Sequence, residues 1–99
     1  MLNINTSANG SELTVTLEGR LDTTTAPSLE TKLQQSLGGV SSLVFDMAAL
    51  SYISSAGLRV LLSAQKTMNK QGDMVLRNVS DDVKEIFEVT GFTDILTIE

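Results

Sequence analysis

The sequence predicts an α/β fold, in which strands alternate with helices that pack on a sheet. Residues 12–18 alternate apolar and polar side chains, as a strand with one wet face does. Residues 43–45 are an unbroken apolar run, typical of a strand buried on both faces. Leu58, Leu61 and Leu62 then recur at helical spacing. With the elements below, the expected order is β-β-α-β-α-β-α-β, which implies a layered α/β domain with right-handed crossovers.

The N-terminal part is expected to form two strands and a helix. A short edge strand covers residues 2–6, and the alternating strand that follows ends at Gly19. The chain then turns at Asp22 into a helix whose first turn tolerates Pro27. The helix presents an apolar stripe at positions i, i+4 and i+8, formed by Leu29, Leu33 and Leu37.

The central stretch, residues 43–62, is the one on which the function depends. We expect a strand over 43–46, a loop from Asp46 to the pair Ser54-Ser55, and a helix over about 56–70. A serine at this place is a common helix cap, because its hydroxyl accepts a hydrogen bond from a free backbone N–H. The same place also suits a phosphate, since free N–H groups and the helix dipole favour negative charge. Both interpretations remain open.

The C-terminal part is expected to add a strand, a helix and a last strand. Residues 74–77 are a short apolar strand, and Ser80 caps a helix that follows. Asp81 and Asp82 lie in its first turn, where they suit the helix dipole. After this helix we expect a final strand over 95–98.

Composition excludes several classes of function. The 99 residues suggest one domain, over 1–99, and the net charge of −5 comes from seven Lys and Arg against twelve Asp and Glu. This balance argues against binding to nucleic acid or to an anionic membrane surface. The basic row formed by Arg59, Lys66 and Lys70 is therefore interpreted as a solvated helix face. We expect a cytoplasmic protein, because neither a signal peptide nor a membrane-spanning run is visible. We also expect it to be monomeric when free.

The residue types also limit catalysis. The chain contains no cysteine and no histidine, which removes thiolate metal sites and the usual base for a serine nucleophile. Asp22 and Asp46 each follow a predicted strand, so we expect them to form a small polar cluster near Ser55. Such a cluster could hold Mg²⁺ only together with a phosphate or a partner's ligands. We therefore expect no metal, no cofactor and no enzymatic activity.

Small and apolar residues around Ser55 have two possible roles. Gly57 lies in the first helical turn, where glycine costs about 1 kcal/mol relative to alanine. This indicates a close approach to the backbone, either by a partner or by a tightly packed strand. Met47 and Leu58 flank the predicted loop as possible partner contacts, although core packing is favoured for Leu58.

Taken together, these segments resemble the STAS domain, a family named for sulphate transporters and anti-sigma factor antagonists. The resemblance covers essentially the whole chain: EGRLDTTTA at 18–26, LVFDMAALSYISSAGLRVLL at 43–62 and GDMVLRNVSDDVKEIFEVTGFTDIL at 72–96. It implies the STAS fold, a mixed β-sheet with crossover helices.

The resemblance also implies a function. Single-domain bacterial members act in partner-switching signalling that regulates transcription. The unphosphorylated protein binds an anti-sigma factor that is also a serine kinase, and this releases the sigma factor. Phosphorylation of one serine breaks the complex, and a metal-dependent phosphatase of the PP2C type restores it.

The family motif Asp-Ser-Ser/Thr-Gly-Leu falls on residues 54–58, so the phosphoacceptor maps to Ser55, and Ser54 stands where Asp is common. Asp22 matches the Asp of the family's Leu-Asp loop, and Asp46 falls where Asp or Asn ends the central strand. The resemblance implies a partner-binding set of Asp22, Thr23, Asp46, Met47, Ser54, Ser55, Ala56, Gly57, Leu58 and Arg59.

Two other functions remain as alternatives. The domain could be a scaffold subunit of a larger complex, such as the small cytoplasmic component of a lipid-transport ABC system, in which no phosphorylation occurs. A small hydrolase using Ser55 is the weaker alternative, because the sequence lacks a suitable base.

Overall fold

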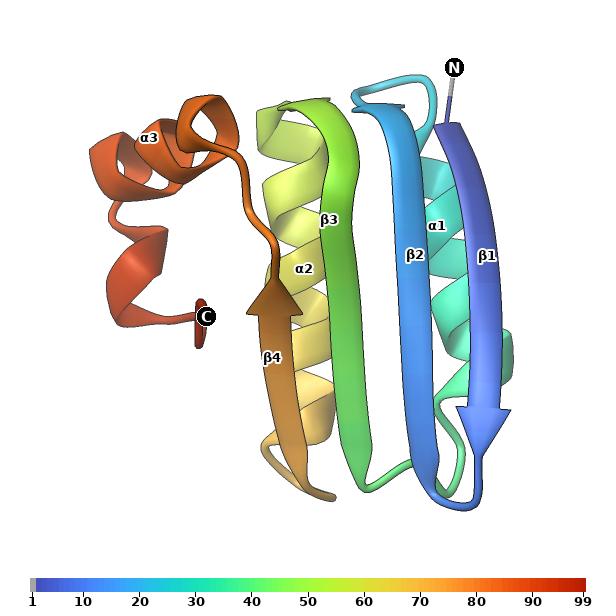
Figure 1. Cartoon of the computed structure of the whole chain (residues 1–99). Helices are drawn as coiled ribbons and strands as arrows, with labels where there is room; N and C mark the ends of the chain where they lie inside the picture. Colours follow the sequence, from blue (N-terminus) through green and yellow to red (C-terminus); the bar gives the residue numbers. More distant parts are fainter. Residues whose placement is uncertain (1) are drawn as a thin grey trace.

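The computed structural model describes residues 2–99 and shows one four-stranded sheet with three helices (Figure 1). The elements, in chain order, are β1 (Leu2–Asn9), β2 (Glu12–Leu21), α1 (Ala26–Ser36), β3 (Ser42–Ile53), α2 (Ser55–Met68), β4 (Asp73–Arg77), α3 (Asp81–Thr90) and the short 3₁₀ helix η1 (Phe92–Asp94).

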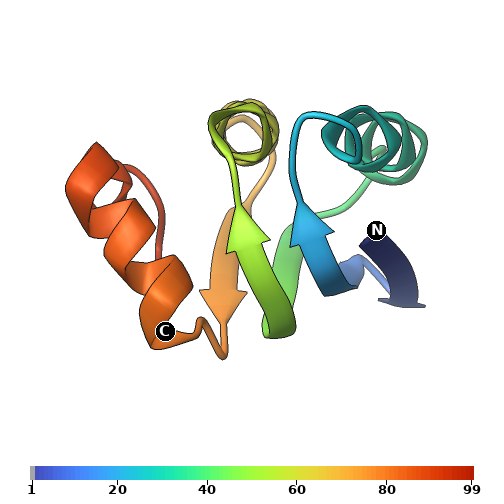
Figure 2. The ribbon, with the colours of Figure 1, turned by 90° about the horizontal axis from the view of Figure 1, so that it is seen from above.

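The sheet is mixed, with the strand order β1-β2-β3-β4. β1 is antiparallel to β2, whereas β2, β3 and β4 are parallel to their neighbours. The parallel strands are joined through α1 and α2, and Figure 2 shows both helices on the same face of the sheet. The predicted fold class and the element order up to α3 are therefore confirmed.

The predicted loop after Asp46 is wrong, because β3 continues to Ile53. At two places β3 carries one more residue than the facing segment of β2, so the pairing shifts register twice. The inward side chains Met47, Leu50 and Ile53 consequently recur every three residues, not every two. Because of this broken period, the two-residue alternation that predicts a strand is absent from the second half of β3.

Three other boundaries differ from the prediction. β1 extends to Asn9 and β2 extends to Leu21, so Gly19 does not end β2. Gly19 lies within the strand at φ +106°, a conformation that glycine adopts without steric cost. The predicted last strand is reduced to one parallel bridge between Ile98 and Leu76, because the chain first turns through η1.

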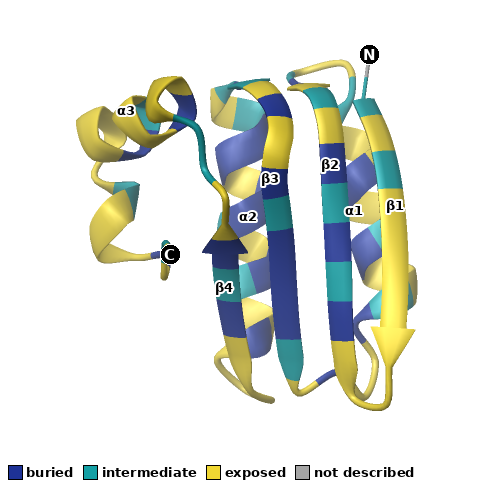
Figure 3. Cartoon of the chain, in the orientation of Figure 1, coloured by how far each residue is buried: buried dark blue, intermediate teal, exposed yellow. Residues whose placement is uncertain are grey.

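A single apolar core lies between the sheet and the helices (Figure 3). β4 pairs only with the first part of β3, from Ser42 to Asp46. α3 lies against the rest of β3 and buries Val83 and Phe87 completely in the core. The sequence forms α3 as expected, since the Ser80 hydroxyl accepts the N–H of Val83 at 3.3 Å.

No helix within residues 2–99 has both the length and the apolar character needed to cross a membrane.

Candidate functional site

The start of α2 is fixed to the end of β2 through Ser54. The Ser54 N–H donates to the carbonyl oxygen of Leu21 at 2.8 Å, and the Ser54 hydroxyl accepts the N–H of Gly57 at 3.4 Å. Ser54 is extended, at φ −98° and ψ 175°, as a residue at the N-cap usually is. Ser54 is therefore the helix cap, and its backbone N–H joins the start of α2 to the end of β2.

Ser55 is the first residue of α2 and is exposed. Within residues 2–99 its hydroxyl forms no hydrogen bond, in contrast to that of Ser54. The two serines thus have different roles: one caps the helix and the other presents a free hydroxyl. The free hydroxyl lies at the positive end of the helix dipole, where an attached anion is electrostatically favoured.

Asp22 organises the turn that leads from β2 to α1. Its Oδ1 accepts hydrogen bonds from the Thr24 hydroxyl at 2.7 Å, the Thr24 N–H at 3.0 Å and the Thr25 N–H at 3.1 Å. These bonds, led by that of the Thr24 hydroxyl, lower the pKa of Asp22 below its ordinary value, although partial desolvation opposes them. Asp22 is therefore a carboxylate held by local donors, as expected for a turn residue.

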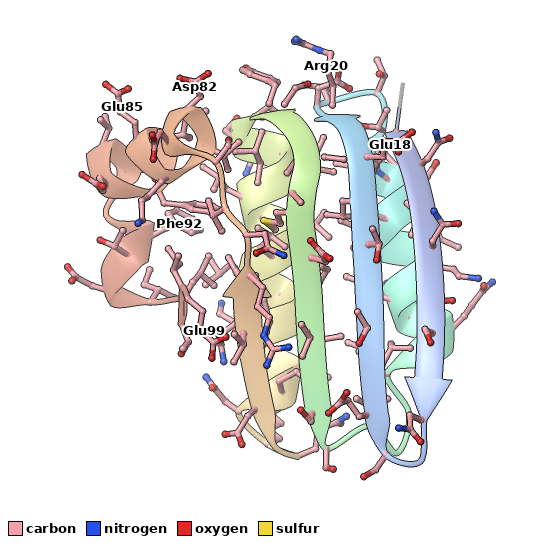
Figure 4. The ribbon with its side chains drawn as sticks, in the orientation of Figure 1. Glu18, Arg20, Asp82, Glu85, Phe92 and Glu99 are labelled. Carbon is pink, nitrogen blue, oxygen red and sulfur yellow. The ribbon has the colours of Figure 1, made fainter. Side chains whose placement is uncertain are left out.

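Arg20 and Tyr52 also lie at this end of the sheet, and the sequence analysis did not place them at the site. Arg20 pairs with Tyr52 across β2 and β3, its guanidinium lies 4.3 Å from the centre of the Tyr52 ring, and its Nε is 3.8 Å from Asp22 Oδ2. Figure 4 shows Arg20 projecting from this end of the molecule. The two residues meet through the parallel register of β2 and β3. Finding the pair from the sequence requires the full length of both strands, which are longer than predicted.

The side chains that approach the backbone of α2 at Gly57 belong to β2 and β3. A Cβ on Gly57 would lie 2.6 Å from Leu21 Cγ and 2.9 Å from Ile53 Cγ1. The glycine therefore allows α2 to pack closely on the ends of β2 and β3. Its contact is with the core of the protein, not with a partner.

Four residues of the expected partner-binding set, the buried Gly57 among them, do not lie on the surface near Ser55. Met47 is completely buried in β3 and Leu58 is 4% exposed, and of these two only Leu58 lies beneath the start of α2. Asp46 lies within β3, roughly 20 Å along the strand from Ile53. Its Oδ1 accepts the Ala48 N–H at 3.1 Å and the Asn78 side-chain amide at 3.2 Å. The expected cluster of Asp22 and Asp46 does not form.

The residues that do come together form what we call the α2-start surface: Asp22, Thr23, Ser54, Ser55, Ala56 and Arg59. Thr23, Ala56 and Arg59 line a groove of about 300 Å³ between α1 and α2. The surface offers a hydroxyl, a carboxylate and a guanidinium at the end of a groove.

Two observations describe the polar groups near the α2-start surface. Within residues 2–99 no three acidic side chains gather as metal ligands would. The Ser55 hydroxyl has no hydrogen-bonded base, which nucleophilic catalysis by serine requires.

The sequence matches a known domain family and known proteins over most of its length. Residues 3–99 match the STAS domain family. The chain is 31% identical over 98 residues to the anti-sigma-B factor antagonist of Bacillus subtilis, covering 98% of this chain and 90% of that protein. It is 38% identical over 84 residues to BtrV of Bordetella bronchiseptica, covering 83% and 72% of the two chains.

Solved structures show the same architecture. The anti-sigma factor antagonist SpoIIAA in its unphosphorylated form superposes with a TM-score of 0.75 at 17% identity, covering 100% of this chain and 87% of that one. The phosphorylated form of the Bacillus cell fate determinant SpoIIAA gives a TM-score of 0.75 at 18% identity, covering 100% and 91%. With the sequence match over nearly the whole chain, these findings show that the protein belongs to the STAS domain family.

Proposed function

We propose that this protein is an anti-sigma factor antagonist controlled by phosphorylation of Ser55. In its unphosphorylated form it binds an anti-sigma factor that is also a serine kinase, and the sigma factor is released. The names of its relatives support this proposal, since the Bacillus subtilis protein is an anti-sigma-B factor antagonist and SpoIIAA is an anti-sigma factor antagonist with a phosphorylated form.

The observation that carries the proposal is the division of roles between Ser54 and Ser55. The hydroxyl of Ser54 is used by the helix, whereas that of Ser55 is exposed and free. A kinase can therefore modify Ser55 without removing the cap of α2. The same difference supports Ser55 over Ser54 as the proposed acceptor, in a motif where Ser54 stands in place of the usual Asp.

A phosphoryl group on Ser55 would act on the interface and leave the fold intact. It adds a charge of roughly −1.5 to −2 and a bulky tetrahedral group. At the first residue of a helix, that charge is favourable for the protein itself. The cost arises only when a partner covers the surface, through steric exclusion and through desolvation of the dianion. Removal of the group by a PP2C-type phosphatase would restore binding.

The remaining residues of the proposed partner-binding set have distinct parts. Asp22, Thr23 and Arg59 are exposed or half-buried around Ser55 and would contact the partner directly. Gly57 and Leu58 would hold the start of α2 in place from within the core. The protein acts in this account as a binding module and a kinase substrate.

The test is affinity capture from the native cells with two variants as bait. Ser55→Ala should retain a protein with a kinase-type ATP site. The complex should persist when ATP is added, because the variant cannot be phosphorylated at residue 55. Ser55→Asp should retain much less of the same protein. Equal recovery of an ABC-transporter ATPase by both variants would contradict the proposal and favour a scaffold role.

A further inference from the structure

α3 carries an exposed face that lies outside the α2-start surface. Its inward residues, Val83 and Phe87, are completely buried. Beside this inward face, α3 carries a stripe at positions i, i+3, i+4, i+7 and i+8, which lines a shallow groove of about 250 Å³. Figure 4 shows Asp82 and Glu85 projecting outward from this helix. We call these residues the α3 stripe: Asp82, Glu85, Ile86, Val89 and Thr90.

The C-terminal half of the α3 stripe is apolar. Val89 is 81% exposed and adjoins Ile86, which is half-buried. The Thr90 hydroxyl donates to the carbonyl oxygen of Ile86 at 2.7 Å, so its polar atom is occupied by the helix backbone. Within residues 2–99 the other exposed large apolar side chain is that of Ile95, which is 48% exposed. The most exposed apolar side chain of the described protein therefore lies in this groove.

The N-terminal half of the α3 stripe is acidic and free of ion pairs. Asp82 and Glu85 are exposed, and the ion pairs within the described residues are Arg20–Asp22 and Arg77–Glu99. The helix dipole accounts for an acid at Asp82, in the first turn. It does not account for Glu85, whose charge faces solvent beside the apolar half.

We propose that the α3 stripe docks a basic amphipathic helix of another protein. A groove along two helical turns with an apolar half and an acidic half matches the face of an amphipathic helix that carries basic residues beside its apolar ones. The unpaired carboxylates at one end require Lys or Arg on the occupant. A second copy of this chain fits poorly. A parallel two-fold contact would set the acidic halves against each other, and an antiparallel one would bury each acidic half against the apolar half of the other copy.

This inference does not depend on the proposed switch, since the α3 stripe contains neither Ser55 nor any residue of the α2-start surface. It gives the protein a second binding face, so one partner could be held at α3 while another is exchanged at Ser55.

The test uses a defined probe and the whole protein. The probe is a helical peptide of about 14 residues made of leucine and lysine, with the lysines on one face. The control peptide carries glutamate in place of lysine. Titration into ¹⁵N-labelled protein should give saturable amide shifts confined to α3 with the basic peptide and none with the acidic one.

Matched variants decide whether the stripe is responsible. Val89→Asp should weaken binding of the basic peptide at least about tenfold, because it places a charge in the apolar half. Glu85→Lys should weaken it too, whereas Glu30→Lys, the same exposed exchange on α1, should not. Val89→Ser checks that loss of the apolar contact alone has an effect.

Three results would overturn the inference. The first is shifts spread over the acidic surface as a whole. The second is equal affinity of wild type and Val89→Asp. The third is shifts at α3 that grow with protein concentration in the absence of peptide, which would make a second copy the occupant.

Discussion

The backbone N–H of Ser54 donates to the carbonyl oxygen of Leu21 at 2.8 Å, which joins the start of α2 to the end of β2. Through this bond the turn organised by Asp22 and the exposed Ser55 are held on one rigid frame. A partner that covers Ser55 therefore also meets the Asp22 turn, and a group added to Ser55 changes a preformed surface.

The first prediction separates the roles of the two serines. Ser54→Ala should lower the free energy of unfolding by about 1 kcal/mol, because Gly57 loses its cap acceptor. Ser55→Ala should leave it nearly unchanged, since the Ser55 hydroxyl holds nothing in the fold. Urea denaturation of the three proteins measures both. Equal destabilisation by the two substitutions would show that Ser55 shares the capping role.

The second prediction concerns close packing at Gly57. Gly57→Ala should destabilise the fold by about 1–3 kcal/mol, because the new methyl would overlap Leu21 and Ile53. The gain in helix propensity, about 1 kcal/mol, offsets only part of this. The matched control is Gly38→Ala, since a Cβ at Gly38 meets nothing within 4 Å. Thermal denaturation should show a lower midpoint for the first variant only; a stabilised Gly57→Ala would contradict the packing.

The third prediction concerns the pKa of Asp22. Because hydrogen bonds to the carboxylate lower this pKa below 3.8 in the folded protein, Asp22 stabilises the fold at pH values above its unfolded pKa. That contribution should disappear as the pH falls through the folded pKa. Thr24→Val should bring the pKa back toward 3.8, whereas Thr31→Val, on an exposed part of α1, should not change it. Carbon-detected NMR titration of the Asp22 carboxyl measures the shift.

The fourth prediction separates stability from binding. Ser55→Asp should leave the free energy of unfolding unchanged or raise it by about 0.3–1 kcal/mol, because a carboxylate suits the start of α2. The same variant should bind the kinase partner more weakly than wild type. Thr67→Asp, at an exposed position of the same helix outside the groove of the α2-start surface, is the control and should not weaken binding through charge alone. Loss of stability in Ser55→Asp would place the switch in the fold.

The sequence predicted the fold class and the helices well, because each helix carries a local signal. Ser80 caps α3 as predicted, and the glycine at position 91 ends the helix in the left-handed region at φ +79°. These features depend on neighbours along the chain. The strand extents were harder, because the bulges in β3 arise from its pairing with β2, which no local pattern reports.

The candidate site was predicted in part for the same reason. The sequence placed Ser54 and Ser55 at a helix start but could not choose between a cap and a free hydroxyl. The choice requires the hydrogen bond to Gly57, which the structure provides. A strand that ends at Asp46 would bring Asp46 near Ser55 and leave Met47 in a surface loop, but pairing with β2 continues β3 to Ile53 and buries Met47.

The most direct measurement of the central claim is the intact mass of the protein isolated from its native cells, before and after phosphatase treatment. Peptide mapping across residues 51–59 locates the group. The account predicts one phosphoryl group, on Ser55 and not on Ser54, in a fraction of molecules that changes with growth conditions. Protein that is unmodified under all conditions, or modified on Ser54, would contradict it.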